Sequence, residues 1–290
     1  MRLSVIIATR DRATMLNRAL ASIAAQRFAP VFEVVVADNG SSDLTPEVIA
    51  SWSDQLPLQS VFVKEPNRAK ARNAAIARAR GGVVIFIDDD VVVPEGFLAA
   101  HSLAHDGIAP AVVSGPIINV SDVDARPLPS AAHYSRAFLC TCNASVPRSE
   151  LVASGGFDES FDRYGWEDTE LGLRLRHLGL RHHFVWDAFL WHIKPALTET
   201  LDVLLQKSIE KARMAARLIE REPSVRVRLA TGAHPVNFAR SRAFAPEWAM
   251  PWLAGVAQSE RFPAFVREAA KGVVLDGVYT AELRRALERS

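Results

Sequence analysis

The sequence predicts an α/β protein, with a mostly parallel sheet flanked by helices and a helical C-terminal extension. Short apolar, β-branched runs alternate with helical patterns early in the chain, as in a parallel sheet covered on both faces. One run, Val83–Ile87, is apolar throughout, which is typical of a central strand buried on both faces. A long amphipathic stripe with helical spacing extends from about Thr198 to Glu222.

Each early element follows from a local pattern. Pro46 is placed to open a helix in its first turn, and Gly81 with Gly82 is placed to end one. In chain order we expect a strand at 3–9, a helix with Leu16, Ala19, Leu20 and Ile23 on one face, a strand at 32–38, a helix from Pro46, a strand at 60–64, a helix at 69–79 and a strand at 83–87.

The pattern loosens after residue 108. Prolines break 109–149 into short strands and loops, a region that we expect to face substrate. A glycine turn and an acidic loop then precede a helix at 169–177. The change to the long amphipathic helix places a boundary near residue 197, which predicts a domain at 1–197 and an extension at 198–290.

Composition excludes some classes of protein. The 290 residues carry a net charge of +1, so there is no strong electrostatic case for a nucleic-acid partner or an anionic membrane, although local charged patches stay open. The N-terminal residues predict a strand and not a signal peptide, and no segment reaches the ~20 apolar residues of a membrane span. We therefore expect a cytoplasmic protein. Cys140 and Cys142 are too few for a disulfide framework or a structural zinc site, and are interpreted as small buried thiols.

Three adjacent aspartates, Asp88, Asp89 and Asp90, directly follow the central strand Val83–Ile87. Carboxylates in a row repel one another, and a solvated surface turn would be the simplest explanation. The carboxyl end of a central strand in an open α/β sheet is, however, where ligands bind. A hard divalent cation such as Mn²⁺ or Mg²⁺ would neutralise the triplet and supply the expected cofactor.

Four motifs in order, SVIIATRDR, VVVADNGSSD, VIFIDDDVVVP, and the region from NASVPRSELVASGGFDESF to GWEDTELGLRLRHLG, resemble a family 2 glycosyltransferase of the Rossmann-like GT-A fold. They extend from residue 3 to about residue 194. The resemblance implies an inverting, metal-dependent, hexosyltransferase-type enzyme that moves a sugar from a nucleotide-sugar donor, a UDP-sugar, to an acceptor hydroxyl. It also implies a nucleotide-binding half at 1–108 and an acceptor half at 109–197.

The resemblance assigns five residues to the nucleotide outside the aspartate triplet. Thr9 and Arg10 end the first strand, and Arg10 would offset diphosphate charge. Asp38 would accept the uracil N3–H, with an Asx-turn brace as the alternative. Asn67 and Arg72 match a segment that lines the nucleotide, although Ala69 stands where a glycine is common. A helix-surface role is the alternative for Arg72.

The same resemblance assigns the metal site. It places Asp88 and Asp90 around the cation and Asp89 toward the ribose, so Asp88 and Asp89 also count as nucleotide-binding. His192 matches a C-terminal histidine that completes the metal site in many GT-A enzymes. Packing in the core is the alternative for a histidine in an aromatic stretch.

The remaining assignments concern acceptor and catalysis. Gly155, Gly156 and Trp166 would border the acceptor, with a tight turn and a buried tryptophan as the alternatives. Asp168 would be the catalytic base and Glu167 would orient the site, and matching of charge to the helix N-terminus is the alternative.

Other classes of function remain as rivals. A nicotinamide-dependent dehydrogenase would share the alternating pattern, but ATRDRAT follows the first strand where that class has G-x-G-x-x-G. A catalytically silent sugar-nucleotide or glycan binding module would keep the fold and lose the acidic motifs. The acceptor stays open between a glycan, a lipid-linked molecule and a small molecule. The C-terminal helices are interpreted as packing elements, with peripheral membrane contact as the alternative.

Overall fold

The computed structural model describes residues 3–28, 31–107, 109–194 and 199–289. The chain divides into two compact units, Met1–Asp162 with Glu167–Leu197, and Arg163–Trp166 with Thr198–Ser290. The division of the first domain into a nucleotide-binding half at 1–108 and an acceptor half at 109–197 concerns the ligands that each half binds, and it stays a prediction.

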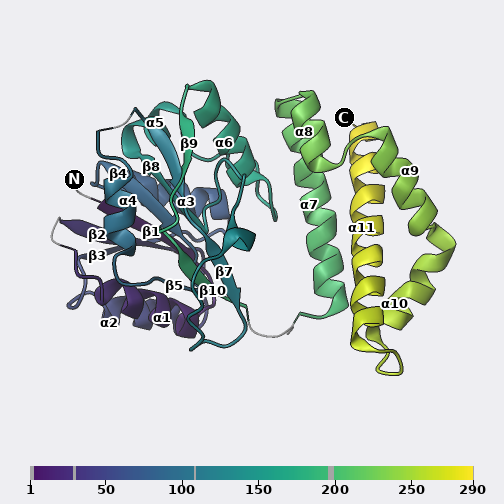
Figure 1. Ribbon diagram of the computed structural model, residues 1–290, viewed down its shortest axis with the longest axis horizontal. Coiled ribbons are helices and arrows are strands. Elements are labelled where there is room, and N and C mark those ends of the chain that lie inside the picture. The colour runs from purple at the N-terminus through teal and green to yellow at the C-terminus, as the bar shows by residue number, and fades with distance from the viewer. Residues whose placement is uncertain (1–2, 29–30, 108, 195–198, 290) are drawn as a thin grey trace. The chain divides into compact units, whose positions relative to one another are not determined.

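A seven-stranded sheet forms the centre of the first unit, in the order β3-β2-β1-β4-β8-β6-β9 (Figure 1). Only β8 is antiparallel to its neighbours β4 and β6, so the predicted mostly parallel sheet is confirmed. β3 begins earlier than predicted because its pairing with β2 already includes Leu58 and Val34. The strands are β1 (Leu3–Thr9), β2 (Phe32–Asp38), β3 (Leu58–Phe62), β4 (Val83–Ile87), β6 (Ala111–Ser114), β8 (Asn143–Pro147) and β9 (Arg181–Phe184).

Helices cover both faces of this sheet because successive strand residues point to opposite sides. In β1, Val5 and Ile7 pack in one core cluster with residues of α1, α2 and α4, whereas Ile6 packs in another with residues of α3, α5 and α6. The helices are α1 (Ala13–Ala24), α2 (Thr45–Ser51), α3 (Arg68–Arg78), α4 (Phe97–Leu103), α5 (Arg148–Ala153) and α6 (Glu167–His177), with a 3₁₀ turn η1 (Ala131–His133).

A second, three-stranded sheet has the order β5-β10-β7. It consists of β5 (Val91–Val92), β7 (Ile117–Val120) and β10 (Leu190–Ile193). β5 follows the aspartate triplet directly and pairs antiparallel with β10, with Val91 opposite His192. This pairing brings a segment near the end of the first unit to the carboxyl end of β4.

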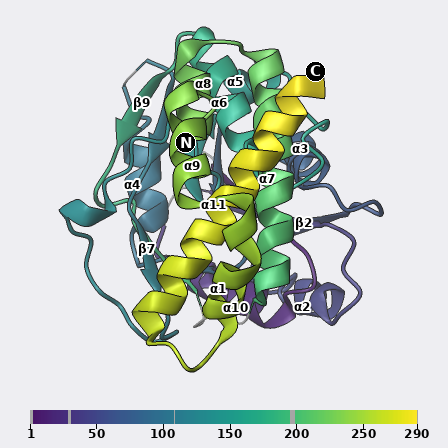
Figure 2. The same ribbon diagram turned by 90° about the vertical axis from the view of Figure 1, so that its right-hand side faces the viewer.

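The second unit is helical, as predicted for the extension. The buried side of α7 includes Ala212, Ala216 and Ile219 of the predicted stripe, and α7 packs along α11 (Figure 2). Thr200 caps α7 by accepting from Val203 N. The elements are α7 (Leu201–Arg221), α8 (Val225–Thr231), α9 (Pro235–Phe244), η2 (Glu247–Ala249), α10 (Met250–Gln258) and α11 (Ala264–Arg289). Among helices of the described ranges, none has the length and apolar character needed to cross a membrane.

Candidate active site

The carboxyl ends of β1 and β4 meet because these strands are parallel neighbours, with Ile7 opposite Ile87. The next residues therefore lie close together, and Thr9 Oγ1 donates to Asp89 Oδ2 at 2.7 Å. Both side chains are buried, and burial raises the pKa of Asp89 to about 6 although Arg12 and Thr9 oppose the shift. The structure thus joins two residues that the sequence assigned to one pocket.

Arg12 reaches the aspartate triplet, a contact that the sequence analysis did not predict. Its Nη1 lies 3.2 Å from Asp89 Oδ1 and 2.6 Å from Asp90 Oδ2. Arg10 is 52% exposed at its side chain and lies 3.5 Å from Asp11. Asp11, which lies between the two arginines, has a left-handed φ of 51°. Arg12 is a site residue that the sequence analysis missed, and the nucleotide contact of Arg10 stays a prediction.

His192 lies beside the triplet, as expected for a residue that shares a metal site. Its Nε2 is 3.0 Å from Asp90 Oδ1, a proximity that follows from the pairing of β10 with β5. Burial alone would raise the pKa of Asp90, but its contacts with His192 and with the Arg12 guanidinium hold that pKa below its ordinary value. Asp90 is therefore an ionised carboxylate in a partly buried site.

Arg72 links the two acidic motifs. This buried guanidinium lies 3.0 Å from Glu167 Oε1, 3.8 Å from Asp168 Oδ1 and 3.7 Å from Asp88 Oδ1. A buried charge requires such partners, because its desolvation is costly. The helix-surface alternative is wrong, since α3 directs Arg72 into the protein. The predicted nucleotide contact of Arg72 stays a prediction, while its partners within the chain are carboxylates.

Asp168 is held by Thr141, which the sequence analysis did not single out. Thr141 N donates to Asp168 Oδ2 at 2.9 Å, and Thr141 Oγ1 donates to the same carboxylate at 2.9–3.1 Å. Burial raises the pKa of Asp168 to about 6, although Arg72 and Thr141 favour the ionised form. A fixed carboxylate with a pKa near neutrality is suited to accept a proton.

Asp38 and Asn67 shape the turns at the ends of β2 and β3. Asp38 Oδ1 accepts from Ser41 N at 2.9 Å, so this side chain braces the turn after β2 as the structural alternative expected, with the donor three residues on and not two as in an Asx-turn. Asn67 caps α3 by accepting from Lys70 N, and its amide donates to Glu159 O at 2.9 Å. Both side chains are buried near strand ends, and their nucleotide contacts stay predictions.

Gly155 and Gly156 form the predicted tight turn, with φ of 81° and 71°. A side chain at Gly156 would come within 2.6 Å of Asn73 Oδ1, so the turn also needs its small size. Trp166 has a left-handed φ of 73°, and its indole N–H donates to Lys211 O at 3.0 Å. The structure gives all three residues structural partners or constraints, and their acceptor contacts stay predictions.

Part of the predicted donor set fits a divalent cation. Asp88 provides a carboxylate oxygen and His192 an imidazole nitrogen, which are ligands used by divalent metal sites. Asp90 is not in that cluster of ligand atoms, because its two oxygens face Arg12 Nη1 and His192 Nε2, and its contact with a metal stays a prediction. Ligand atoms of Asp88, His192 and also Cys142 all lie within 4.8 Å of one another. Cys142 was interpreted as a buried thiol, and it is buried, but its place beside two predicted metal ligands was not foreseen.

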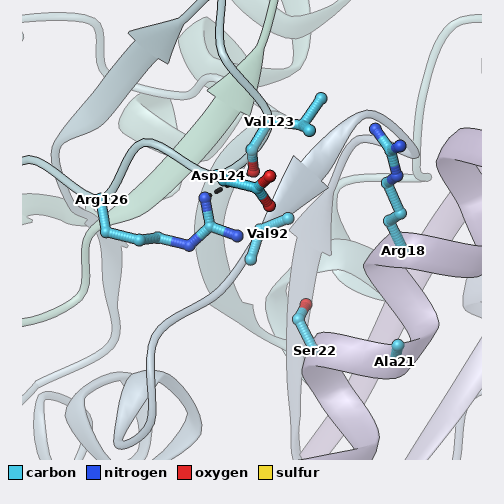
Figure 3. A pocket seen from close by; sticks show the side chains of 7 residues that line it. All are labelled: Arg18, Ala21, Ser22, Val92, Val123, Asp124 and Arg126. Carbon is cyan, nitrogen blue, oxygen red and sulfur yellow. Dashed lines mark hydrogen bonds between the residues drawn. The ribbon is translucent and has the colours of Figure 1, made fainter.

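A separate pocket of about 380 Å³ in the first unit shares no residue with this site (Figure 3). Arg126 bends back onto its own loop there and donates to Val123 O at 2.6 Å. The pocket is lined by Arg18, Ala21, Ser22, Val92, Val123, Asp124 and Arg126. It contains none of the predicted catalytic or nucleotide-binding residues.

Comparison with known sequences agrees with the predicted resemblance. The profile of the family described as Glycosyl transferase family 2 matches residues 4–157, more than half of the chain. Validoxylamine A glucosyltransferase from Streptomyces hygroscopicus subsp. limoneus is 32% identical, with 61% of this chain and 48% of that protein covered. The uncharacterized glycosyltransferase YfnE of Bacillus subtilis (strain 168) is 28% identical over 62% of each chain. The chain spans about half the length of the first two relatives.

Solved structures share the fold. TarS 1–349 of S. aureus aligns with a TM-score of 0.60 at 20% identity, covering 100% of this chain and 92% of that chain. Mannosyltransferase PcManGT from Pyrobaculum calidifontis, solved in complex with GDP-Man and Mn²⁺, aligns with a TM-score of 0.61 at 20% identity, covering 99% and 86%. The α/β fold of the GT-A type predicted from the sequence is confirmed.

Proposed function

We propose that this chain, which belongs to glycosyl transferase family 2, transfers a sugar from a nucleoside diphosphate donor to an acceptor hydroxyl with inversion. The contact set of Arg72 carries the proposal. One buried guanidinium faces Asp88 of the predicted donor site and Glu167 and Asp168 of the predicted catalytic pair. One guanidinium thus lies within 4 Å of carboxylates from motifs that are far apart in sequence, which supports the proposal that these motifs act as one site.

In the proposed reaction, Asp168 accepts the proton of the acceptor hydroxyl. The oxygen of that hydroxyl forms a bond to the anomeric carbon of the donor sugar. The bond from that carbon to the diphosphate oxygen breaks in the same displacement, which inverts the anomeric configuration. Thr141 fixes the orientation of Asp168, and Arg72 with Glu167 sets the charge around it. A divalent cation held by Asp88, Asp90 and His192 would supply positive charge for the diphosphate leaving group.

The donor is predicted to be a UDP-sugar, because Asp38 at the end of β2 matches the residue that accepts from uracil. Structures with a similar fold support either uracil or guanine as the nucleobase of the donor, since TarS 1–349 was solved with UDP-GlcNAc and PcManGT with GDP-Man. We therefore propose nucleotide-sugar binding at the carboxyl ends of β1, β2 and β4. The choice of uridine depends on Asp38 alone and is tested separately below.

The test is a turnover screen over UDP-, GDP-, ADP- and TDP-sugars with Mn²⁺ or Mg²⁺, following release of the nucleoside diphosphate. We expect at least one donor to be hydrolysed slowly without acceptor and faster with added glycan, lipid-linked or small-molecule acceptors. Binding of a donor with no turnover under any of these conditions would instead support the catalytically silent module. The cytoplasmic location stays a prediction.

The C-terminal helices support peripheral membrane contact as a secondary proposal. Phe244, Trp248, Trp252 and Phe265 are 67–84% exposed, and Glu247 is the only charged residue between Ala243 and Ser259. Exposed tryptophans in a weakly charged segment suit the interfacial region of a bilayer. Replacement of both tryptophans by serine should abolish co-sedimentation with phosphatidylcholine vesicles. Equal sedimentation of the variant and the wild type would contradict this proposal.

A further inference from the structure

Three side chains from different segments place unlike metal ligands together. Asp88 follows β4, Cys142 precedes β8, and His192 lies in β10. β4 and β8 are antiparallel with Ile87 opposite Asn143, so the next residues along this register are Asp88 and Cys142. The pairing of β10 with β5 brings in His192. The backbone register of two sheets thus explains why these ligand atoms lie within 4.8 Å of one another.

The ligand set is mixed in chemical softness. A carboxylate alone favours Mg²⁺ or Mn²⁺, whereas a thiolate with an imidazole favours Zn²⁺ and Co²⁺. Cys142 is only 7% exposed, and its sulfur lies within 4.8 Å of the ligand atoms of Asp88 and His192.

We propose that Cys142 is a metal ligand together with Asp88 and His192, and that this site binds Zn²⁺ more tightly than Mg²⁺. The inference deepens the proposed function, because Asp88 and His192 are also the residues proposed to hold the catalytic cation. When the sulfur bonds to the metal, the thiol proton passes to the buffer, and no electron is transferred. A zinc ion at this position would compete with the cation that supports donor binding.

Cobalt provides a direct test in the absence of any nucleotide. The full-length chain is stripped with a chelator and titrated with Co²⁺, for which thiolate ligation gives a charge-transfer absorption in the near ultraviolet. We expect this band in the wild type and in Cys140→Ser, a matched control because Cys140 lies outside the cluster, and its loss in Cys142→Ser. Zn²⁺ should displace Co²⁺, while Mg²⁺ should need a concentration at least about a hundredfold higher.

The wild-type spectrum keeps the inference testable even if Cys142→Ser does not fold. The sequence has two cysteines, so a band that persists in folded Cys140→Ser identifies Cys142. Absence of the band in wild type, its loss only in Cys140→Ser, or displacement by Mg²⁺ as readily as by Zn²⁺ would each overturn the inference. Donor turnover without a cobalt–thiolate band would contradict ligation by Cys142 and leave the proposed function intact. A band without turnover of any donor would support ligation by Cys142 and contradict the proposed function.

Discussion

Replacement of Asp168 by asparagine should remove catalysis and preserve the fold. The asparagine carbonyl can still accept from Thr141 N, and the Thr141 hydroxyl can rotate to accept from the new amide. Arg72 keeps its closest partner, Glu167 at 3.0 Å. The structural change therefore amounts to about one hydrogen bond, or ~1 kcal/mol of unfolding free energy. Loss of a positioned base lowers the rate by roughly 10²–10⁴-fold, equivalent to about 3–5 kcal/mol in the barrier.

The assay is transfer kinetics with the best donor found in the screen, beside calorimetric binding of UDP and a melting curve. We expect kcat to fall by that factor, with the Kd for UDP and the melting temperature little changed. Glu167→Gln should lower kcat less, because Glu167 pairs with Arg72 and only orients the site. An Asp168→Asn enzyme with near wild-type kcat would refute the assignment of the base.

Four further predictions follow from the same site. The pKa of Asp168 is raised to about 6, and the catalytic base must be ionised to accept a proton. We therefore expect kcat/KM to rise about tenfold from pH 5 to pH 7 and then level off. The residual activity of Asp168→Asn should lack this pH dependence. Arg72→Met should lower the unfolding free energy by about 3–5 kcal/mol, because it leaves Glu167 and its neighbouring carboxylates without the Arg72 guanidinium. Urea titration measures this change, and an unchanged urea midpoint would contradict it. Asp38→Ala should weaken UDP binding by about 10–100-fold and narrow the preference over ADP, whereas equal wild-type affinity for all nucleoside diphosphates would exclude base recognition by Asp38. Chelation should abolish donor turnover and Mn²⁺ or Mg²⁺ should restore it; full activity of protein shown to be metal-free by elemental analysis would rule out the metal.

The parts of the site that could be predicted lie at strand ends. Apolar runs identify β1 and β4, and adjacent parallel strands necessarily bring Thr9 close to Asp89. The glycine turn at Gly155–Gly156 was likewise predictable, because left-handed backbone favours glycine.

The parts that could not be predicted depend on contacts between distant segments. The pairing of Arg72 with Glu167 spans 95 residues, and no periodicity in the sequence specifies it. Whether Arg10 or Arg12 faces the triplet depends on the left-handed backbone of Asp11. β5 has only two residues, too few for a pattern, yet its pairing positions His192. The place of Cys142 opposite Asp88 follows from an antiparallel register that only the structure specifies.

The anomeric configuration of the transferred sugar tests the central claim most directly. Proton NMR of the first product, formed from a donor of known configuration, distinguishes a single displacement from a double one. The account predicts a product of opposite configuration to the donor, with its formation reduced by roughly 10²–10⁴-fold in Asp168→Asn. A product of retained configuration, formed at a rate that does not depend on Asp168, would contradict it.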